Sequence, residues 1–277
     1  MNALVAIGTE EAYEAIDRPA LYRFLMARKS AEGGFYMHDG GEVDIRGSYC
    51  ALSVASVTNL LTPELTAGCA EFLVRCQTYE GGFAGYPGNE AHGGYSFCGL
   101  AACAIIECME ELDADALLHW CTAKQLTYEG GFNGRTNKVV DSCYSFWQGG
   151  VFPLLHRMLK ARRGQGPPVY GSGEEAPEGT WLFDQKMLQK YTLLAAQAPT
   201  GGLKDKPGKG KDYYHTCYAL SGLSVSQHCA DAAAPCVLGE DENLLRQTDE
   251  IHNVCLDKVE AAYEFFQGKG QVQSRRT

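Results

Sequence analysis

Tyr79-Glu80-Gly81-Gly82-Phe83 is the clearest copy of a short phrase that recurs along this chain and decides which fold to expect. Related copies begin at Ala31, Tyr128 and Pro199. The first glycine of each pair stands at position 33, 81, 130 or 201, so the copies are separated by 48, 49 and 71 residues. Repetition at such a period is typical of proteins built from stacked copies of one supersecondary unit.

A second phrase, which combines small or hydroxyl residues with aromatic ones, lies at a fixed distance from the first. It begins 13 residues after the second glycine, at Tyr95, Tyr144 and His215, and the first repeat has Ser48-Tyr49-Cys50 about two residues later. Each copy opens an apolar segment with helical spacing, namely residues 49–61, 95–109, 144–159 and 214–228, and Pro153 predicts a kink in the third. Further helical patterns cover residues 64–76, 114–125, 181–196 and 257–267. No convincing strand pattern occurs.

The repeats predict pairs of helices joined by glycine-rich turns, because a glycine just past a helix end can adopt the left-handed conformation needed there. One helix of each pair is apolar nearly all round and should be inner, and its amphipathic partner should be outer. Such pairs either stack into an open solenoid or close into a ring. Closure would gather the starts of all inner helices on one face. We therefore expect a single all-α domain over residues 1–277, folded as an alpha-alpha barrel (toroid).

Three segments depart from the repeat. Residues 163–180, which account for the long step, are rich in glycine, proline and glutamate and predict an inserted loop. Residues 268–277 predict a polar C-terminal tail. Met1-Asn2-Ala3-Leu4 begins in mid-pattern without a capping residue, which predicts a barrel that is incomplete at its N-terminal end.

The composition narrows the class of protein. Hydrophobic residues make up 45% of the 277 residues, and the net charge of -10, with a pI of about 5.2, argues against a general nucleic-acid-binding protein. The sequence contains no apolar run long enough for a membrane span and no basic, apolar leader, so neither a span nor a secretory signal is expected. The 12 cysteines form no CxxC pair and lie mostly in apolar stretches, which favours reduced, buried thiols in the cytoplasm.

Asp141 and Cys143 stand two residues apart at the start of the helical segment 144–159 and are the first candidate metal ligands. A helix start lets both side chains reach one ion, and its positive end favours a carboxylate and a thiolate. His215, at the start of the next inner segment, is the candidate third ligand. Three such ligands suit zinc with one open position, which a substrate thiolate would occupy. The alternative is that Cys143, like most cysteines, is a small buried hydrophobic residue.

Cationic groups precede the same helix. Arg135 and Lys138, together with His92 and the hydroxyl of Tyr144, predict a site for a phosphate or diphosphate. The alternative is a solvated loop for the two cations and a structural, backbone-bonded histidine for His92. Asp205, on a loop rich in glycine, proline and lysine, could hold Mg²⁺ against such a diphosphate or could belong to a charged surface turn.

Aromatic residues at the same face predict a cavity for a long apolar chain or, alternatively, ordinary inner-helix core. They are Tyr49, Tyr95, Phe97, Trp147 and Tyr214. Zinc, a cationic pocket and an apolar cavity together indicate one chemistry, in which a thiolate attacks the first carbon of an allylic diphosphate and yields a thioether.

Four stretches resemble the beta subunits of protein farnesyltransferases, and the likeness extends over nearly the whole chain, from about residue 2 to 267. They are Gly40-Gly41-Glu42-Val43-Asp44-Ile45-Arg46, Glu90-Ala91-His92-Gly93-Gly94-Tyr95, the phrase at residues 141–147, and Asp205-Lys206-Pro207-Gly208 with His215-Thr216-Cys217-Tyr218. The resemblance implies an alpha-alpha barrel with zinc on Asp141, Cys143 and His215. It assigns the farnesyl diphosphate head to His92, Arg135, Lys138 and Tyr144.

The same resemblance implies roles for further residues. The isoprenoid channel would be lined by Arg46, Tyr49, Cys98 and Trp147. Glu42 and Arg46 would help to orient the C-terminal carboxylate of a peptide, and Tyr214 would border the peptide pocket. Asp205 matches a carboxylate that is linked to Mg²⁺.

The family works as a heterodimer with an alpha subunit and transfers farnesyl to the cysteine of a C-terminal CaaX motif. Geranylgeranyltransferase type I, the alternative within the family, resembles a chain with lysine at the position of Asp205, so Asp205 favours farnesyl. Family members carry further helices before the position of Met1, which leaves open a non-catalytic helical-repeat protein that only binds the alpha subunit. A terpene-cyclase barrel matches less well because the sequence has no D-x-D-D run.

Overall fold

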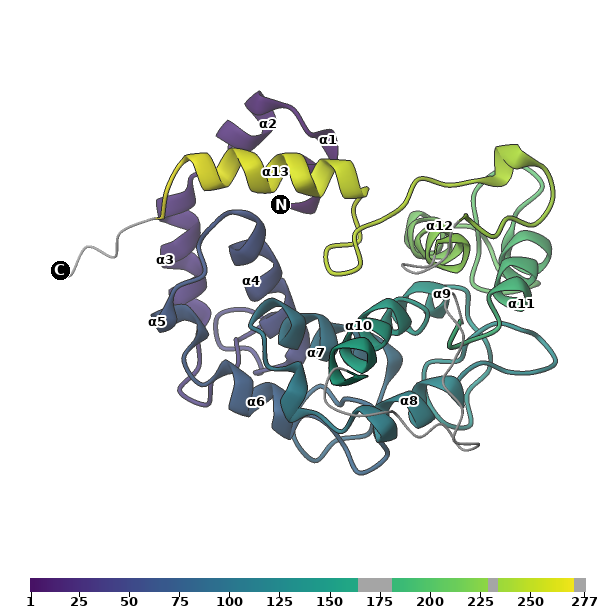
Figure 1. Cartoon of the computed structure of the whole chain (residues 1–277), viewed down its shortest axis with the longest axis horizontal. Coiled ribbons are helices and arrows are strands. Elements are labelled where there is room, and N and C mark those ends of the chain that lie inside the picture. The colour runs from purple at the N-terminus through teal and green to yellow at the C-terminus, as the bar shows by residue number, and fades with distance from the viewer. Residues whose placement is uncertain (164–180, 229–233, 272–277) are drawn as a thin grey trace.

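The computed structural model describes residues 1–163, 181–228 and 234–271. Within these ranges the chain folds into helices, and its extended segments pair only through isolated β-bridges. Figure 1 shows the helices following one another around a curve, with α1 (Asn2–Ile7) and α2 (Glu10–Glu14) beside the C-terminal α13 (Leu256–Gly268). The predicted all-α class is confirmed. The insertion predicted at 163–180, apart from its first residue, and the tail beyond residue 271 lie outside the described residues.

Inner helices begin at equivalent positions of the four repeats. They are α4 (Ile45–Val57), α7 (Gly93–Ile105), α9 followed by α10 (Tyr144–Trp147 and Val151–Arg163) and α12 (Tyr213–Gln227). A side chain before each start accepts a hydrogen bond from a backbone N–H that has no partner within the helix. These acceptors are Asp44, His92, Asp141 and Asp212. Their spacing equals that of the glycine pairs, so the cap belongs to the repeat.

Backbone hydrogen bonds between neighbouring repeats bring these helix starts together. The residue after the cap donates its N–H to a carbonyl in the loop of the next repeat. The pairs are Ile45 with Gly85 at 2.8 Å, Gly93 with Gly134 at 2.8 Å, and Ser142 with Asp205 at 2.9 Å. Because the three bonds are equivalent, each repeat places the start of its inner helix beside the loop that leads into the following one.

The other helices between α3 and η3 do not belong to this inner set. They are α3 (Arg18–Arg28), α5 (Pro63–Thr66), α6 (Cys69–Arg75), α8 (Ala114–Thr122), α11 (Gln185–Lys190), its continuation as a π-helix, η2 (Tyr191–Ala196), and the short turns η1 (Met109–Glu111) and η3 (Asp241–Asn243). The single helix predicted over residues 64–76 is wrong. Gly68, with a φ of 70°, separates α5 from α6. Its carbonyl lies close to Gly33, and a β-carbon on Gly33 would be only 1.8 Å from the carbonyl oxygen of Gly68.

The helix predicted over residues 144–159 is two helices, and a break at Gly149 and Gly150 replaces the kink predicted at Pro153. A β-carbon on Gly149 would lie 2.1 Å from the carbonyl oxygen of Ser145, so the turn is too tight for a larger residue. Pro153 falls in the first turn of α10, where the missing N–H of proline removes no hydrogen bond. The break separates the short α9, which the candidate ligands Asp141 and Cys143 immediately precede, from the apolar α10.

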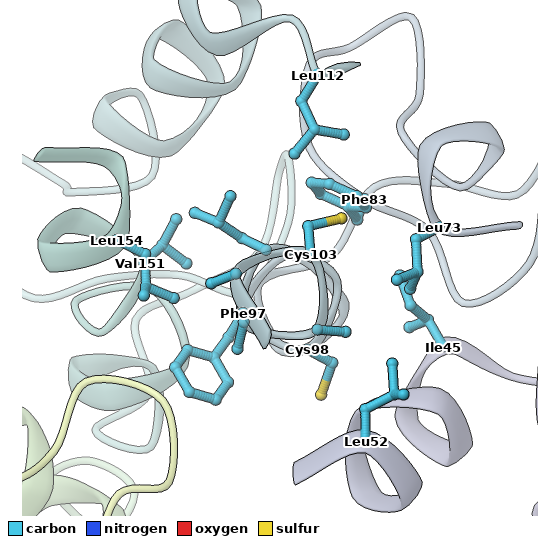
Figure 2. Close-up of a cluster of buried hydrophobic side chains, with 14 of the residues drawn as sticks. Ile45, Leu52, Leu73, Phe83, Phe97, Cys98, Cys103, Leu112, Val151 and Leu154 are labelled. Atoms are coloured by element: carbon cyan, nitrogen blue, oxygen red, sulfur yellow. The ribbon is translucent and has the colours of Figure 1, made fainter. Parts of the chain in front are cut away.

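Helix α7 lies at the centre of the main hydrophobic core, as Figure 2 shows. Its Phe97 and Cys103 are completely buried, and it packs against α4, α6, α9 and α10. Gly99 permits this packing, because a β-carbon there would lie 2.4 Å from the ring of Phe83. A smaller cluster that includes Val5, Tyr13, Val259 and Phe266 joins α1 and α2 to α13. None of the described helices has the length and hydropathy needed to cross a bilayer, and the described cysteines are free thiols.

Candidate metal centre and anion pocket

The three predicted metal ligands come together although they belong to different repeats. One ligand atom from each of Asp141, Cys143 and His215 lies within 4.8 Å of the others. The Nε2 atom of His215 is 3.3 Å from Oδ1 of Asp141. Among the described residues this is the one group of three or more such side chains that could hold a metal ion.

The turn that leads into α9 explains why residues 141 and 143 can share an ion. The carboxylate of Asp141 accepts a hydrogen bond of 2.9 Å from the backbone N–H of Cys143. The carbonyl of Asp141 accepts another of 3.0 Å from the N–H of Tyr144, so the chain turns tightly before the helix. In a regular helix, residues two apart would point to different sides. Here both residues lie in the turn that precedes the helix, and their side chains reach the same point.

Asp212 orients His215 and was not singled out from the sequence. As the cap of α12 it accepts a hydrogen bond of 2.7 Å from the backbone N–H of His215, and its second carboxylate oxygen lies 2.6 Å from Nδ1 of the same residue. With Nδ1–H held by Asp212, Nε2 is free to bind a metal, and such outer partners raise the basicity of a histidine ligand. An aspartate three residues before a candidate histidine at a helix start is the signal that could have found it.

The donor set fits zinc. Carboxylate, thiolate and imidazole are its usual protein ligands, and three of them leave one coordination position open. Burial raises the pKa of the Cys143 thiol, and the adjacent Asp141 carboxylate raises it further. A divalent cation at this point would reverse that effect, because it stabilises the thiolate and releases the proton. A cation bound between the Cys143 sulfur and the Asp141 carboxylate would therefore relieve the unfavourable pairing of the two anionic groups.

Removing the Asp212 carboxylate should weaken metal binding without touching a ligand. In Asp212→Asn the amide oxygen can still cap α12, but the charge that holds Nδ1–H is lost, and we expect zinc affinity to fall about 10- to 100-fold. Competition with a chromophoric chelator measures this. Asp184→Asn is the matched control, because Asp184 caps α11 with an equivalent bond of 2.9 Å to the N–H of Met187. Equal affinity in the wild type and Asp212→Asn would show that Asp212 only caps the helix.

A cavity of about 450 Å³ adjoins the metal centre and contains the predicted anion-binding groups. Its lining is Glu90, His92, Tyr95, Gly134, Arg135, Lys138, Val139, Asp141, Tyr144 and Lys206. Arg135 forms a salt bridge of 2.8 Å with Glu90, and both side chains remain partly exposed. Lys206, which the sequence did not single out as an anion ligand, pairs with the carboxylate of Asp205. Asp205 therefore lies at the edge of this pocket, and its carbonyl accepts hydrogen bonds from Ser142 and Tyr191.

His92 is a hydrogen-bonding group in this pocket rather than the expected cation. Burial lowers the pKa of His92, and Arg135 lowers it further, so the ring is neutral near pH 7. Its Nδ1 accepts a bond of 3.1 Å from the N–H of Gly94, which leaves the proton on Nε2. Nε2 lies 2.9 Å from the hydroxyl oxygen of Tyr144 and donates to it. The Tyr144 O–H is thereby free to donate to an anion.

Aromatic rings form a continuous wall that starts at the metal centre. From His215 the contacts pass to Tyr214 (ring centroids 5.1 Å apart), Tyr218 (4.8 Å), Trp147 (4.5 Å), Phe97 (5.7 Å) and finally Tyr49 (5.4 Å). The indole N–H of Trp147 also donates to the hydroxyl of Tyr214 at 3.0 Å. We call these six rings the aromatic wall. Tyr218 was missed from the sequence, although its spacing of four from Tyr214 places both on one helix face.

The remaining predicted residues lie around the start of α4 and in α7. Arg46 donates two hydrogen bonds, of 2.8 and 3.0 Å, to Asp44, and its guanidinium lies over the ring of Tyr95. Glu42 is 3.8 Å from the same guanidinium. Cys98 is buried in α7. Asp44, another cap of the repeat, was not singled out, although it fixes Arg46 at the rim of the site.

A family model described as the prenyltransferase alpha-alpha toroid domain matches residues 1–254. This chain belongs to the prenyltransferase family. Relatives of this chain include proteins named protein farnesyltransferase subunit beta. The one from Arabidopsis thaliana is 39% identical over 96% of the chain, and the one from Dictyostelium discoideum is 48% identical over 82%. The chain spans 65% and 46% of their respective lengths.

A solved structure supports the same fold for this chain. Candida albicans protein geranylgeranyltransferase-I complexed with GGPP matches with a TM-score of 0.67 at 23% identity, covering 92% of this chain and 68% of that one. The predicted toroid and the resemblance to farnesyltransferase beta subunits are therefore confirmed.

Proposed function

We propose that this chain is the beta subunit of a zinc-dependent protein farnesyltransferase, a single barrel domain that acts in the cytoplasm as a heterodimer with an alpha subunit. The observation that carries the proposal is the Asp141, Cys143 and His215 cluster beside a basic pocket and at one end of the aromatic wall. Relatives named farnesyltransferase subunit beta support the choice of reaction. The substrates are farnesyl diphosphate and the cysteine thiol of a C-terminal CaaX motif.

Asp141, Cys143 and His215 would hold the zinc ion. When bound, zinc keeps a coordinated substrate thiol deprotonated at neutral pH. Arg135, Lys138 and the Tyr144 hydroxyl bind the diphosphate and stabilise the charge that it gains as it leaves. Asp205 would share Mg²⁺ with the same diphosphate.

The aromatic wall supplies position. It binds the apolar chain so that the first carbon, which is bonded to the diphosphate, lies near the thiol. Because both reactants are then held in place, the reaction no longer depends on their random encounter in solution. A carbon–sulfur bond forms, the carbon–oxygen bond breaks, and the electron pair leaves with the diphosphate. Arg46, Tyr49, Cys98 and Trp147 line the isoprenoid side, while Glu42 and Tyr214 border the peptide.

The test is a transfer assay on the chain co-expressed with the alpha subunit of a related farnesyltransferase. We expect about one zinc per heterodimer and transfer of farnesyl to a CaaX peptide, with none to the same peptide carrying serine for cysteine. A clear preference for geranylgeranyl diphosphate would assign the type I alternative. A heterodimer that forms but neither binds zinc nor transfers would make the chain a non-catalytic repeat protein.

A further inference from the structure

Residues 134–138, which we call the anion loop, carry Arg135 and Lys138 into the anion pocket. A hydrogen bond of 2.9 Å from the side-chain amide of Asn133 to the carbonyl of Lys138 closes the loop at its base. Thr136 lies at the tip, where the chain turns, and stands between the two cations in the sequence. The positions of both cations therefore depend on how the tip of the loop is held.

Lys124, two residues after the end of α8, holds this tip. Its Nζ atom donates a hydrogen bond of 3.0 Å to the hydroxyl of Thr136. Its backbone carbonyl accepts a bond of 3.0 Å from the N–H of Asn133 at the base of the same loop. The side chain and the backbone of one residue thus contact the anion loop at its tip and at its base, and a hydrogen bond from a charged donor is stronger than one from a neutral donor.

The charge of Lys124 is buried without a carboxylate partner. The residue is 5% exposed, and no other lysine or arginine whose side chain the structure describes is buried. Within the described part of the chain, its ammonium group contacts the Thr136 hydroxyl and the ring of Trp120, 4.8 Å away. Burial lowers the pKa of Lys124, whereas Glu80 and Glu90 raise it, and the face of an aromatic ring favours the charged form. Because a buried cation without a counter-ion costs stability, an apolar residue of similar size should be at least as stable here.

Arg28 occupies the position of Lys124 in the first repeat. Each lies over an aromatic ring four residues earlier in the chain, and each backbone carbonyl accepts a hydrogen bond from the turn that follows. Arg28 forms a salt bridge with Asp39, which corresponds to Thr136 because both stand four residues after the phenylalanine of the glycine phrase. The first repeat therefore fixes its loop with an ion pair, and the third repeat uses a charged donor and a neutral hydroxyl.

The neutral acceptor suits a loop that binds an anion. A carboxylate at position 136 would stand between Arg135 and Lys138 and would repel a diphosphate, because like charges brought together at a binding site are unfavourable. The hydroxyl of Thr136 accepts the bond from Lys124 without adding negative charge. This pair thus fixes the anion loop while leaving its positive charge available.

We propose that Lys124 is a positioning residue for the diphosphate, whose charged hydrogen bond to Thr136 holds the anion loop so that Arg135 and Lys138 reach the pocket. This inference rests on the proposed function, which supplies the diphosphate. Lys124 neither lines the anion pocket nor belongs to the metal cluster. Its loss should therefore weaken diphosphate binding and leave zinc binding unchanged.

The experiment measures the dissociation constant of farnesyl diphosphate in the zinc-loaded heterodimer, with inorganic pyrophosphate as a competitor. In Lys124→Met we expect about tenfold weaker binding of both, the size of effect that one hydrogen bond from a charged group gives. Zinc content should stay at the wild-type value, and the thermal midpoint should be no lower. Lys124→Arg, which keeps the charge and the donor, should bind nearly as tightly as the wild type.

Thr136→Val tests whether Lys124 acts through the loop. It removes the acceptor of the same bond, so we expect a similar loss of affinity, and the double variant with Lys124→Met should bind no more weakly than either single variant. Arg28→Met is the matched control, because Arg28 makes the equivalent contact in the first repeat but lies outside the anion pocket. Its affinity for farnesyl diphosphate should be that of the wild type.

The outcomes separate this inference from the proposal on which it rests. A wild-type heterodimer that does not bind farnesyl diphosphate would overturn both. Wild-type binding with an unchanged dissociation constant in Lys124→Met would overturn the positioning role alone. Weaker binding accompanied by loss of zinc and a lower thermal midpoint would make Lys124 a general structural residue, which contradicts the inference. Additive losses in the double variant would also contradict it, because Lys124 would then not act through Thr136.

Discussion

Cys143→Ala is expected to lose the zinc ion and, with it, all measurable transfer, while diphosphate binding is retained. The thiolate is one of three ligands, so its loss should reduce metal affinity by more than the 10- to 100-fold expected for an outer partner such as Asp212. The diphosphate contacts proposed for Arg135, Lys138 and Tyr144 would not involve the sulfur. Atomic absorption on the purified heterodimer measures the metal, and a fluorescent diphosphate analogue measures the anion site.

Cys108→Ala is the control for the loss of a buried thiol. Cys108 and Cys143 are equally buried, at 4% exposed, but Cys108 lies after α7, outside the metal cluster. Both variants should lose about 1 kcal/mol of unfolding free energy, as expected when a small buried group is removed. Only Cys143→Ala should lose zinc. If both metal and diphosphate binding disappeared from Cys143→Ala, the substitution would have disrupted the fold, and if zinc remained, the ligand assignment would be wrong.

The sequence was sufficient to predict that the candidate metal ligands Asp141, Cys143 and His215 come together, because they occupy repeat positions. Asp141 is the cap of one inner helix and His215 lies in the first turn of the next, so closure of the repeats brings them together without further information. The helix break at Gly149 could not be foreseen in the same way. Glycine in an apolar segment is compatible with a helix, and only the approach of the Ser145 carbonyl shows that the chain must turn there.

The partners of these residues were less accessible to sequence reasoning. Asp44 and Asp212 were overlooked because capping aspartates are common, and their second roles, toward Arg46 and His215, depend on where the side chains end in three dimensions. A further copy of the bridged turn, between Thr248 and Cys255, was overlooked because Asn253 replaces the glycine that marked the other copies. Asparagine tolerates a positive φ, so the backbone keeps the conformation of the other copies although the glycine pair is missing from the sequence.

Gly222→Ala is expected to damage both stability and metal binding, although residue 222 is two turns from the nearest ligand. Gly222 lies on α12 where it crosses α9, and a β-carbon there would be 2.3 Å from both the carbonyl carbon and the β-carbon of Ser145. No side chain can move aside to relieve a contact with the backbone. The helices must separate, which increases the distance between His215 on α12 and Asp141 before α9, 3.3 Å in the native structure.

We expect Gly222→Ala to lose about 1–3 kcal/mol of unfolding free energy, the usual cost of overpacking a core, and to bind zinc at least about tenfold more weakly. Urea denaturation and chelator competition measure the two effects, the latter at a temperature where circular dichroism shows a folded chain. Gly268→Ala is the control, since a β-carbon there meets nothing within 4 Å and alanine favours a helix by roughly 0.5–1 kcal/mol. Reduced stability with native zinc affinity would show that the ligand cluster tolerates movement of α12. Reduced affinity in the folded variant would show that the crossing of α12 and α9 holds the metal centre together.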